Sequence, residues 1–236
     1  MRENTQRPVP AEYGDTVNIH SVFKTIQGEG PHCGERALFI RLNGCNLRCP
    51  GCDTEYTEKS QLVTKYWMVK KAQESHWPHG ALVVITGGEP MRQSIAEPIR
   101  LLLEAGYKVQ IETNGVLWPE GLDDLIYRYG GHDKFMIVCS PKTSRIHHRV
   151  LACAAAFKYV IREGEVDNAD GLPQRALMHT ANGGVQRPNE RAKVYVQPMD
   201  EGDEERNAMN LAATIGSCLR YGYTLQIQVH KHINME

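Results

Sequence analysis

The stretch FIRLNGCNLRCPGCDT, residues 39–54, joins the end of a predicted β-strand to a loop that carries three cysteines. Cys45, Cys49 and Cys52 are separated by three and then two residues, so three thiols share one short loop. Thiolates are soft ligands that suit both zinc and iron–sulfur clusters. A structural zinc site is normally closed by four protein ligands, whereas three cysteines on a four-iron cluster leave one iron open. The spacing favours a [4Fe–4S] cluster; a zinc site completed by His32, or ordinary buried cysteines, are the alternatives.

Outward from this loop, predicted strands alternate with predicted helices along most of the chain. Val- and Ile-rich runs predict strands, and longer amphipathic patterns predict helices. The strands are expected at 17–26, 37–42, 82–86, 108–113, 135–140, 157–161, 193–197 and 224–230, and the helices at 66–76, 95–105, 122–128 and 204–220. This alternation predicts an α/β fold with a mostly parallel sheet, either open or curled into a barrel.

Two segments stand apart from the alternation. Residues 1–16 are polar and contain proline, which indicates an N-terminal arm before a single domain over 17–236. Residues 162–191 are rich in glycine, proline and asparagine without an apolar period, so we expect a surface excursion there. A chain of 236 residues can fill one core without dividing into two domains.

Residues able to do chemistry follow the predicted strands at their carboxyl ends. They include the cysteine loop, residues 87–90, residues 114–115, residues 141–142, residues 198–200 and His230. In (β/α) barrels that face carries the active site, so these groups are expected to converge on one pocket. The alternative is that loops are generally polar and these residues share no site.

Composition and charge narrow the class of protein. Apolar residues make up 41% of the chain and charged residues 23%, which is ordinary for a soluble globular protein. With 27 Lys and Arg against 28 Asp and Glu, the sequence lacks the basic surplus of a nucleic-acid binder, so a small-molecule substrate is expected. The polar start and the absence of a long apolar run predict a cytoplasmic protein.

The cysteine spacing and the segment Gly87-Gly88-Glu89-Pro90 together resemble the radical S-adenosylmethionine (SAM) superfamily. The resemblance implies an incomplete (β/α) barrel in which the open iron binds the amino and carboxylate groups of SAM. Reductive cleavage of SAM then supplies the radical, so no protein side chain is expected to be catalytic. Gly51 departs from the pattern, because the residue before the third cysteine is often bulky in the superfamily.

Further segments resemble one family within the superfamily, the 7-carboxy-7-deazaguanine synthases. They are TIQGEG (25–30), FIRLNGC (39–45), CDT (52–54), TGGEPM (86–91), ETNG (112–115), SPK (140–142), QPMD (197–200) and QVHK (228–231). The resemblance implies a lyase of 7-deazapurine biosynthesis, the chemistry that also leads to queuosine. It would contract 6-carboxy-5,6,7,8-tetrahydropterin to 7-carboxy-7-deazaguanine and release ammonia. It also implies Mg²⁺, a homodimer, and an electron donor such as flavodoxin or ferredoxin.

The same resemblance assigns roles to residues. Mg²⁺ prefers oxygen ligands, which suits Thr54, and a guanidinium fork suits the substrate carboxylate, which fits Arg41. The substrate set implied is Ile26, Gln27, Gly28, Glu29, Arg41, Thr86, His230 and Glu236. The SAM set implied is Gly51, Asp53, Gly88, Glu89, Ser140, Pro141, Lys142, Gln197, Pro198, Met199 and Asp200. Without the resemblance, Thr54 reads as a turn cap, Lys142 as a solvated lysine and His230 as a structural histidine.

Two other functions compete with this interpretation. A glycyl-radical activating enzyme shares the cysteine spacing but acts on a protein backbone, and it gives no reason for residues 27–29 or 52–54. A non-catalytic iron–sulfur or zinc module would not cleave SAM. Motifs of this kind are hypotheses that require their structural context.

Overall fold

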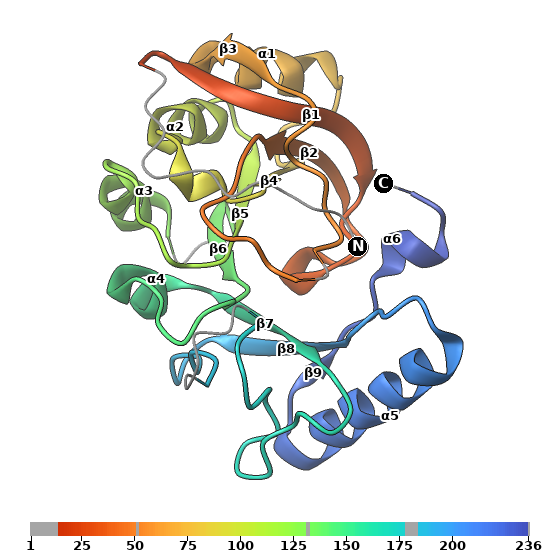
Figure 1. The fold of residues 1–236 in the computed structure, drawn as a ribbon. Coiled ribbons are helices and arrows are strands. Elements are labelled where there is room, and N and C mark those ends of the chain that lie inside the picture. Colours follow the sequence, from red (N-terminus) through yellow and green to blue (C-terminus); the bar gives the residue numbers. More distant parts are fainter. Residues whose placement is uncertain (1–13, 51, 131–132, 178–183, 236) are drawn as a thin grey trace.

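Nine strands form one sheet in the computed structural model, which describes residues 14–50, 52–130, 133–177 and 184–235 (Figure 1). The strands are β1 (Thr16–Ile26), β2 (Arg36–Leu42), β3 (Gln61–Thr64), β4 (Leu82–Gly87), β5 (Lys108–Thr113), β6 (Phe135–Cys139), β7 (Ala156–Ile161), β8 (Lys193–Pro198) and β9 (Thr224–Leu225). The helices are α1 (Lys65–Glu74), α2 (Ala96–Glu104), α3 (Leu122–Tyr129), α4 (His148–Cys153), α5 (Glu204–Tyr221) and α6 (Val229–His232), with short 3₁₀ turns η1 (Gly30–His32) and η2 (Pro90–Arg92).

The sheet is mostly parallel and does not close. Its order is β3-β1-β2-β4-β5-β6-β7-β8-β9, and every pair from β2 to β9 is parallel. Strand β1 runs antiparallel to both β2 and β3. Among the described residues β3 and β9 remain the two edges, so the predicted incomplete barrel is confirmed.

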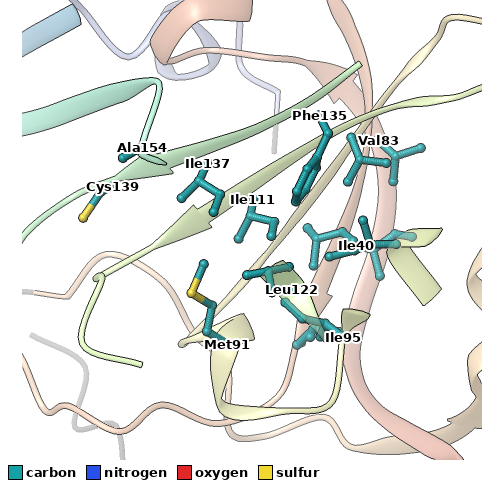
Figure 2. Packing of buried hydrophobic residues seen from close by; sticks show 14 of the residues in the cluster. Ile40, Val83, Met91, Ile95, Ile111, Leu122, Phe135, Ile137, Cys139 and Ala154 are labelled. Atoms are coloured by element: carbon teal, nitrogen blue, oxygen red, sulfur yellow. The ribbon is translucent and has the colours of Figure 1, made fainter. Parts of the chain in front are cut away.

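One face of the sheet packs against the helices and makes the main core. Alternate residues such as Ile40, Val83 and Ile111 are buried there beside Ile95 and Leu122, as Figure 2 shows. Side chains of a parallel strand alternate between two faces, and covering one face with helices removes it from water. Full burial of each such side chain contributes about 1.5–3 kcal/mol.

The opposite face carries polar residues near the carboxyl ends of the strands. Arg41 pairs in register with Thr86, and Val160 pairs with Gln197. Glu112 on β5 and Lys158 on β7 occupy the same face, because each is offset by one residue from the helix-facing positions. The polar row of the sheet consists of Arg41, Thr86, Glu112, Lys158 and Gln197. On the inner face of the sheet it is available to a ligand.

The structure corrects the predicted elements at several places. Strand β3 and helix α4 were not predicted, and the last strand is β9 (Thr224–Leu225) instead of 224–230. His230 therefore lies in α6 and not at a strand end. Gln226 N still donates to Val196 O of β8, and beyond it the side chains of Gln226 and Gln228 donate to Gly28 O and Glu29 Oε1 in the loop after β1.

The two segments set apart in the sequence differ in how much of them is described. Of the predicted arm, residues 1–13 lie outside the described residues, and Thr16 already begins β1. The segment 162–191 connects β7 to β8 and buries Leu172, Ala176 and Val185 in the main core. Ser217 of α5 donates to Gly171 O at 2.6 Å, so the segment packs on that helix. No helix among the described residues is long and apolar enough to cross a bilayer.

Candidate active site

A cavity of about 340 Å³ opens at the carboxyl ends of the strands and collects the residues singled out in the sequence. The predicted residues that line it are Ile26, Gln27, Gly28, Glu29, Arg41, Cys45, Cys49, Cys52, Asp53, Thr54, Thr86, Gly88, Ser140, Lys142, Gln197, Pro198, Met199, Asp200 and His230. Glu89 and Pro141 do not line it, and Gly51 and Glu236 lie outside the described residues. The expected convergence is thus observed, and the binding roles stay predictions.

The three cysteines lie on one wall of this cavity. Cys45 is buried, and Cys49 and Cys52 are half-buried. In the part of the chain that the structure describes, no three His, Cys, Asp or Glu side chains are close enough together to hold one metal ion. A four-iron cluster attaches each thiolate to a different iron, so its cysteines stand farther apart than the ligands of one zinc ion. Three thiols on one cavity wall supply the protein ligands that such a cluster needs.

Backbone of the β4 loop packs directly against the cysteine loop. A Cβ added to Gly88 would lie 2.7 Å from Cys45 Cβ and would also collide with the Gly44 carbonyl. Glu89 N donates to Gly44 O at 3.0 Å. Only glycine allows this approach, which leaves the Gly88 backbone at the cavity wall next to the thiols.

The Glu89 carboxylate is fully buried and does not line the cavity. It accepts hydrogen bonds from Thr113 Oγ1 (2.7 Å), Asn114 N (2.7 Å) and Met91 N (2.9 Å). Burial raises the pKa of Glu89 to about 7, although these three hydrogen bonds oppose the shift. In this structure the side chain therefore fastens the β4 loop to the β5 loop.

We expect Glu89→Ala to lower the free energy of unfolding of the apoprotein by about 3 kcal/mol or more, because each buried donor left without an acceptor costs about 1–3 kcal/mol. Glu89→Gln should cost less than half as much, since its amide oxygen still accepts. Urea denaturation measures both variants, with the exposed Glu104→Ala as control. Equal losses for Ala and Gln would contradict the hydrogen-bonding role.

A buried ionic group that sequence reasoning missed lies on the floor of the cavity. Lys158 forms an ion pair with Glu29 and lies 3.8 Å from Glu112 Oε1. Gln27 Nε2 also donates to Glu112 Oε1, at 3.0 Å. In the sequence, Glu112 stands out only as part of the segment ETNG (112–115), and Lys158 does not stand out. The signal that could have identified Lys158 is a lysine at an inward position of an otherwise apolar parallel strand.

The C-terminal segment closes one side of the cavity. Gln228 Nε2 donates to Glu29 Oε1 at 2.7 Å, and Val229 N donates to Gly28 O at 3.4 Å. The His230 ring lies so close to Gly28 that a Cβ there would overlap it. Gly28 therefore allows α6 to dock on the loop after β1, which brings His230 to the cavity wall.

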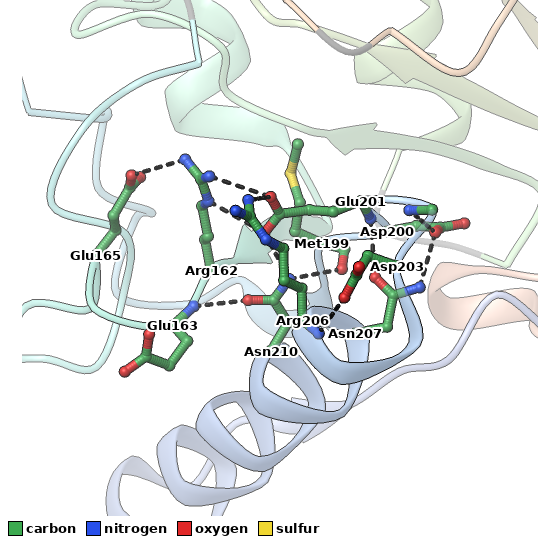
Figure 3. Close-up of polar contacts among 11 residues, drawn as sticks. Arg162, Glu163, Glu165, Met199, Asp200, Glu201, Asp203, Arg206, Asn207 and Asn210 are labelled. Atoms are coloured by element: carbon green, nitrogen blue, oxygen red, sulfur yellow. Dashed lines mark hydrogen bonds and ion pairs between the residues drawn. The ribbon is translucent and has the colours of Figure 1, made fainter. Parts of the chain in front are cut away.

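The loop after β8 is held in place by α5, as Figure 3 shows. Asp200 accepts from Lys231 Nζ (2.7 Å), Gly202 N (3.1 Å) and Asn207 Nδ2 (3.0 Å), and these contacts lower the pKa of Asp200 to about 2. Asn210 Nδ2 donates to Met199 O at 3.0 Å. The backbone of residues 197–200 is thus fixed at the cavity edge before any ligand binds.

Oxygen and nitrogen groups for further ligands stand on the walls near the cysteines. Thr54 Oγ1 donates to Asp53 Oδ1 at 3.1 Å, so a hydroxyl and a carboxylate lie together at the cavity. Lys142 Nζ donates to Ser140 Oγ at 3.0 Å on another wall. The first pair suits a hard cation, and the second pair offers a positive charge and a hydroxyl to an anionic ligand.

Comparisons with known proteins agree with this geometry. Residues 39–135 match the radical SAM superfamily. The 7-carboxy-7-deazaguanine synthase of Rhodospirillum rubrum is 41% identical over 98% of this chain and 97% of its own, and that of Rickettsia prowazekii is 35% identical over 99% and 94%. The crystal structure of QueE from Escherichia coli superposes with a TM-score of 0.66 at 22% identity, covering 90% of this chain and 94% of its own, which supports the fold.

Proposed function

Because this chain belongs to the 7-carboxy-7-deazaguanine synthase family of radical SAM enzymes, we propose that its cavity contracts 6-carboxy-5,6,7,8-tetrahydropterin to 7-carboxy-7-deazaguanine with release of ammonia. One observation carries the proposal. The three cysteines, the Gly88 backbone and the polar row of the sheet line the same cavity. A radical source and a polar binding surface for a heterocycle would therefore share one cavity.

The residues fit the cofactors of the superfamily. Cys45, Cys49 and Cys52 would hold the [4Fe–4S] cluster, which together with SAM supplies the radical that removes a hydrogen atom from the substrate. Gly88 lets the β4 loop approach the cysteine loop closely, so its backbone lies at the cavity wall where the methionine end of SAM would bind. Lys142 and the fixed backbone of residues 197–200 offer positive charge and hydrogen bonds to the rest of SAM.

The inner face of the sheet would hold the substrate. Arg41 stacks its guanidinium 5.5 Å from the centre of the Phe23 ring, which keeps the fork at the cavity for the substrate carboxylate. Glu112 Oε2 accepts one hydrogen bond from the described residues, a long 3.5 Å contact from Thr86 Oγ1. It is thereby placed to accept from an N–H edge of the pterin. His230 and the backbone of Gly28 complete the wall.

We also propose that Thr54 is the protein ligand of Mg²⁺, together with the substrate carboxylate and waters. Thr54→Ala should raise the Mg²⁺ concentration needed for half-maximal turnover by about tenfold, because it removes one oxygen ligand worth about 1.4 kcal/mol. Thr64→Ala is the control, since Thr64 is exposed and its side chain caps no helix. An unchanged Mg²⁺ titration in Thr54→Ala would remove it from the metal site.

The electron donor, the cellular compartment and the oligomeric state are proposed from the chemistry of the reaction and from the family. Reducing the cluster needs a low-potential one-electron donor, so a flavodoxin or ferredoxin is the proposed partner. All seven cysteines are free, which suits the reducing cytoplasm. We propose a homodimer in line with the family, and sedimentation velocity measures it directly.

Cleavage of SAM separates this function from the alternatives. Reconstituted protein with dithionite and SAM should form 5′-deoxyadenosine. The rate of that formation should respond to added 6-carboxy-5,6,7,8-tetrahydropterin. A non-catalytic iron–sulfur or zinc module would form none. A glycyl-radical activating enzyme would form 5′-deoxyadenosine without any response to the pterin.

A further inference from the structure

Lys158 is a cation enclosed inside the cavity floor. Its side chain is 8% exposed, and it points from the inner face of β7 toward two carboxylates that come from distant parts of the chain. Glu29 follows β1 and forms a direct ion pair with Lys158, while Glu112 on β5 lies 3.8 Å away. Buried lysines are rare unless paired, so this arrangement calls for a reason beyond filling space.

The two carboxylates are used unequally by the protein. Glu29 has both oxygens engaged, one by Lys158 and the other by Gln228 at 2.7 Å. Glu112 Oε1 receives Gln27 at 3.0 Å and Gln110 at 3.1 Å. Its Oε2 receives only the long contact of Thr86 among the described residues. Each Glu29 oxygen therefore has a short contact within the protein, whereas Glu112 Oε2 has only a long one and keeps most of its capacity to accept from a ligand in the cavity.

The charges explain why a cation is needed at this place. Two carboxylates and one ammonium leave a net charge of −1, whereas the carboxylates alone would place two negative charges together away from water. Burial would raise the pKa of Glu29, but the charge and hydrogen bond of Lys158, with the hydrogen bond of Gln228, outweigh it and lower the pKa to about 2. Without Lys158, one of the two carboxyls would be driven to take up a proton.

We propose that Lys158 is a positioning residue of the substrate site, which neutralises Glu29 so that Glu112 remains an ionised acceptor for the pterin. The inference rests on the proposed function, because it needs a substrate with an N–H edge. Lys158 acts through the two carboxylates and need not touch the substrate. The free carboxylate, and not the lysine, meets the ligand.

The test compares Lys158→Met, which keeps the stem and removes the charge, with the double variant Glu29→Gln/Lys158→Met, which returns the net charge to −1. Lys158→Met should raise KM for the carboxytetrahydropterin by about tenfold or more, with a much smaller change in kcat. The double variant should recover at least half of that loss on a logarithmic scale. Lys158→Arg should also recover part of it, and exposed Lys70→Met should match wild type.

A second readout does not depend on turnover. Isothermal titration of reconstituted protein with 6-carboxypterin, in the presence of SAM and without reductant, should give the same order of affinities. Wild-type affinity in Lys158→Met, or a double variant no better than the single one, would overturn the inference. If Lys158→Met does not fold, the double variant decides alone. An affinity of the double variant that is about tenfold weaker than that of wild type, or more, contradicts the proposal. Failure of wild type itself to bind or turn over would overturn the proposed function, and this inference with it.

Discussion

Cys49→Ala is expected to abolish both cluster assembly and SAM cleavage. Three thiolates are the minimum that holds a four-iron cluster with one open iron, and no fourth cysteine lines the described part of the cavity. After anaerobic reconstitution, wild-type protein should contain about four irons per chain, and the variant should show neither that iron content nor the cluster absorbance. Cys45→Ala and Cys52→Ala should behave in the same way.

Cys218→Ala is the matched control, because Cys218 is half-buried on α5 and does not line the cavity. Its iron content and SAM cleavage should equal those of wild type. Stoichiometric zinc in wild-type protein, with no iron-dependent absorbance after reconstitution, would contradict the cluster assignment. The same result would restore the zinc module as the better interpretation of the cysteine loop.

Arg41→Lys is expected to raise KM for the carboxytetrahydropterin by about thirtyfold to a hundredfold. The ammonium keeps the charge but cannot form the two parallel hydrogen bonds of a guanidinium to a carboxylate. Losing such a contact costs about 2–3 kcal/mol, which corresponds to that change in affinity. Steady-state kinetics measure the shift, and SAM cleavage uncoupled from product formation should persist.

Arg36→Lys is the control on the same strand, since Arg36 is exposed at the start of β2 and lies outside the cavity. It should leave KM unchanged. If Arg41→Lys instead stops SAM cleavage while the cluster stays intact, Arg41 contacts the cofactor. The substrate would then have to occupy another part of the cavity.

The sequence predicted the fold where the pattern was strong. Apolar runs such as Leu82–Gly87 and Ala156–Ile161 are buried on both faces of a parallel sheet, so each is recognisable alone. Strand β3 has four residues, of which three are exposed, and α4 has six residues, so neither carries enough pattern to be predicted. The alternating tail after Thr224 has the pattern of a longer strand, but its glutamine side chains bond to the loop after β1 and the chain continues into α6.

The candidate site was predictable where its residues form loop motifs. Cysteines, paired glycines and prolines at strand ends are visible in one dimension, and nearly all of those singled out line the cavity. Lys158 was missed because it is a single charged residue inside an otherwise apolar strand, and Glu112 was missed because its strand carries several other polar residues. Their partners, Glu29 and Gln27, are more than eighty residues away, and only the sheet order brings them together.

The most direct measurement is detection of the product. Reconstituted protein is incubated anaerobically with SAM, a reductant, Mg²⁺ and 6-carboxy-5,6,7,8-tetrahydropterin, and the mixture is analysed by mass spectrometry. The account predicts 7-carboxy-7-deazaguanine in an amount that grows over many turnovers, with SAM recovered and not consumed in step with product. Cleavage of SAM without any deazaguanine, under conditions where the cluster is intact, would contradict it.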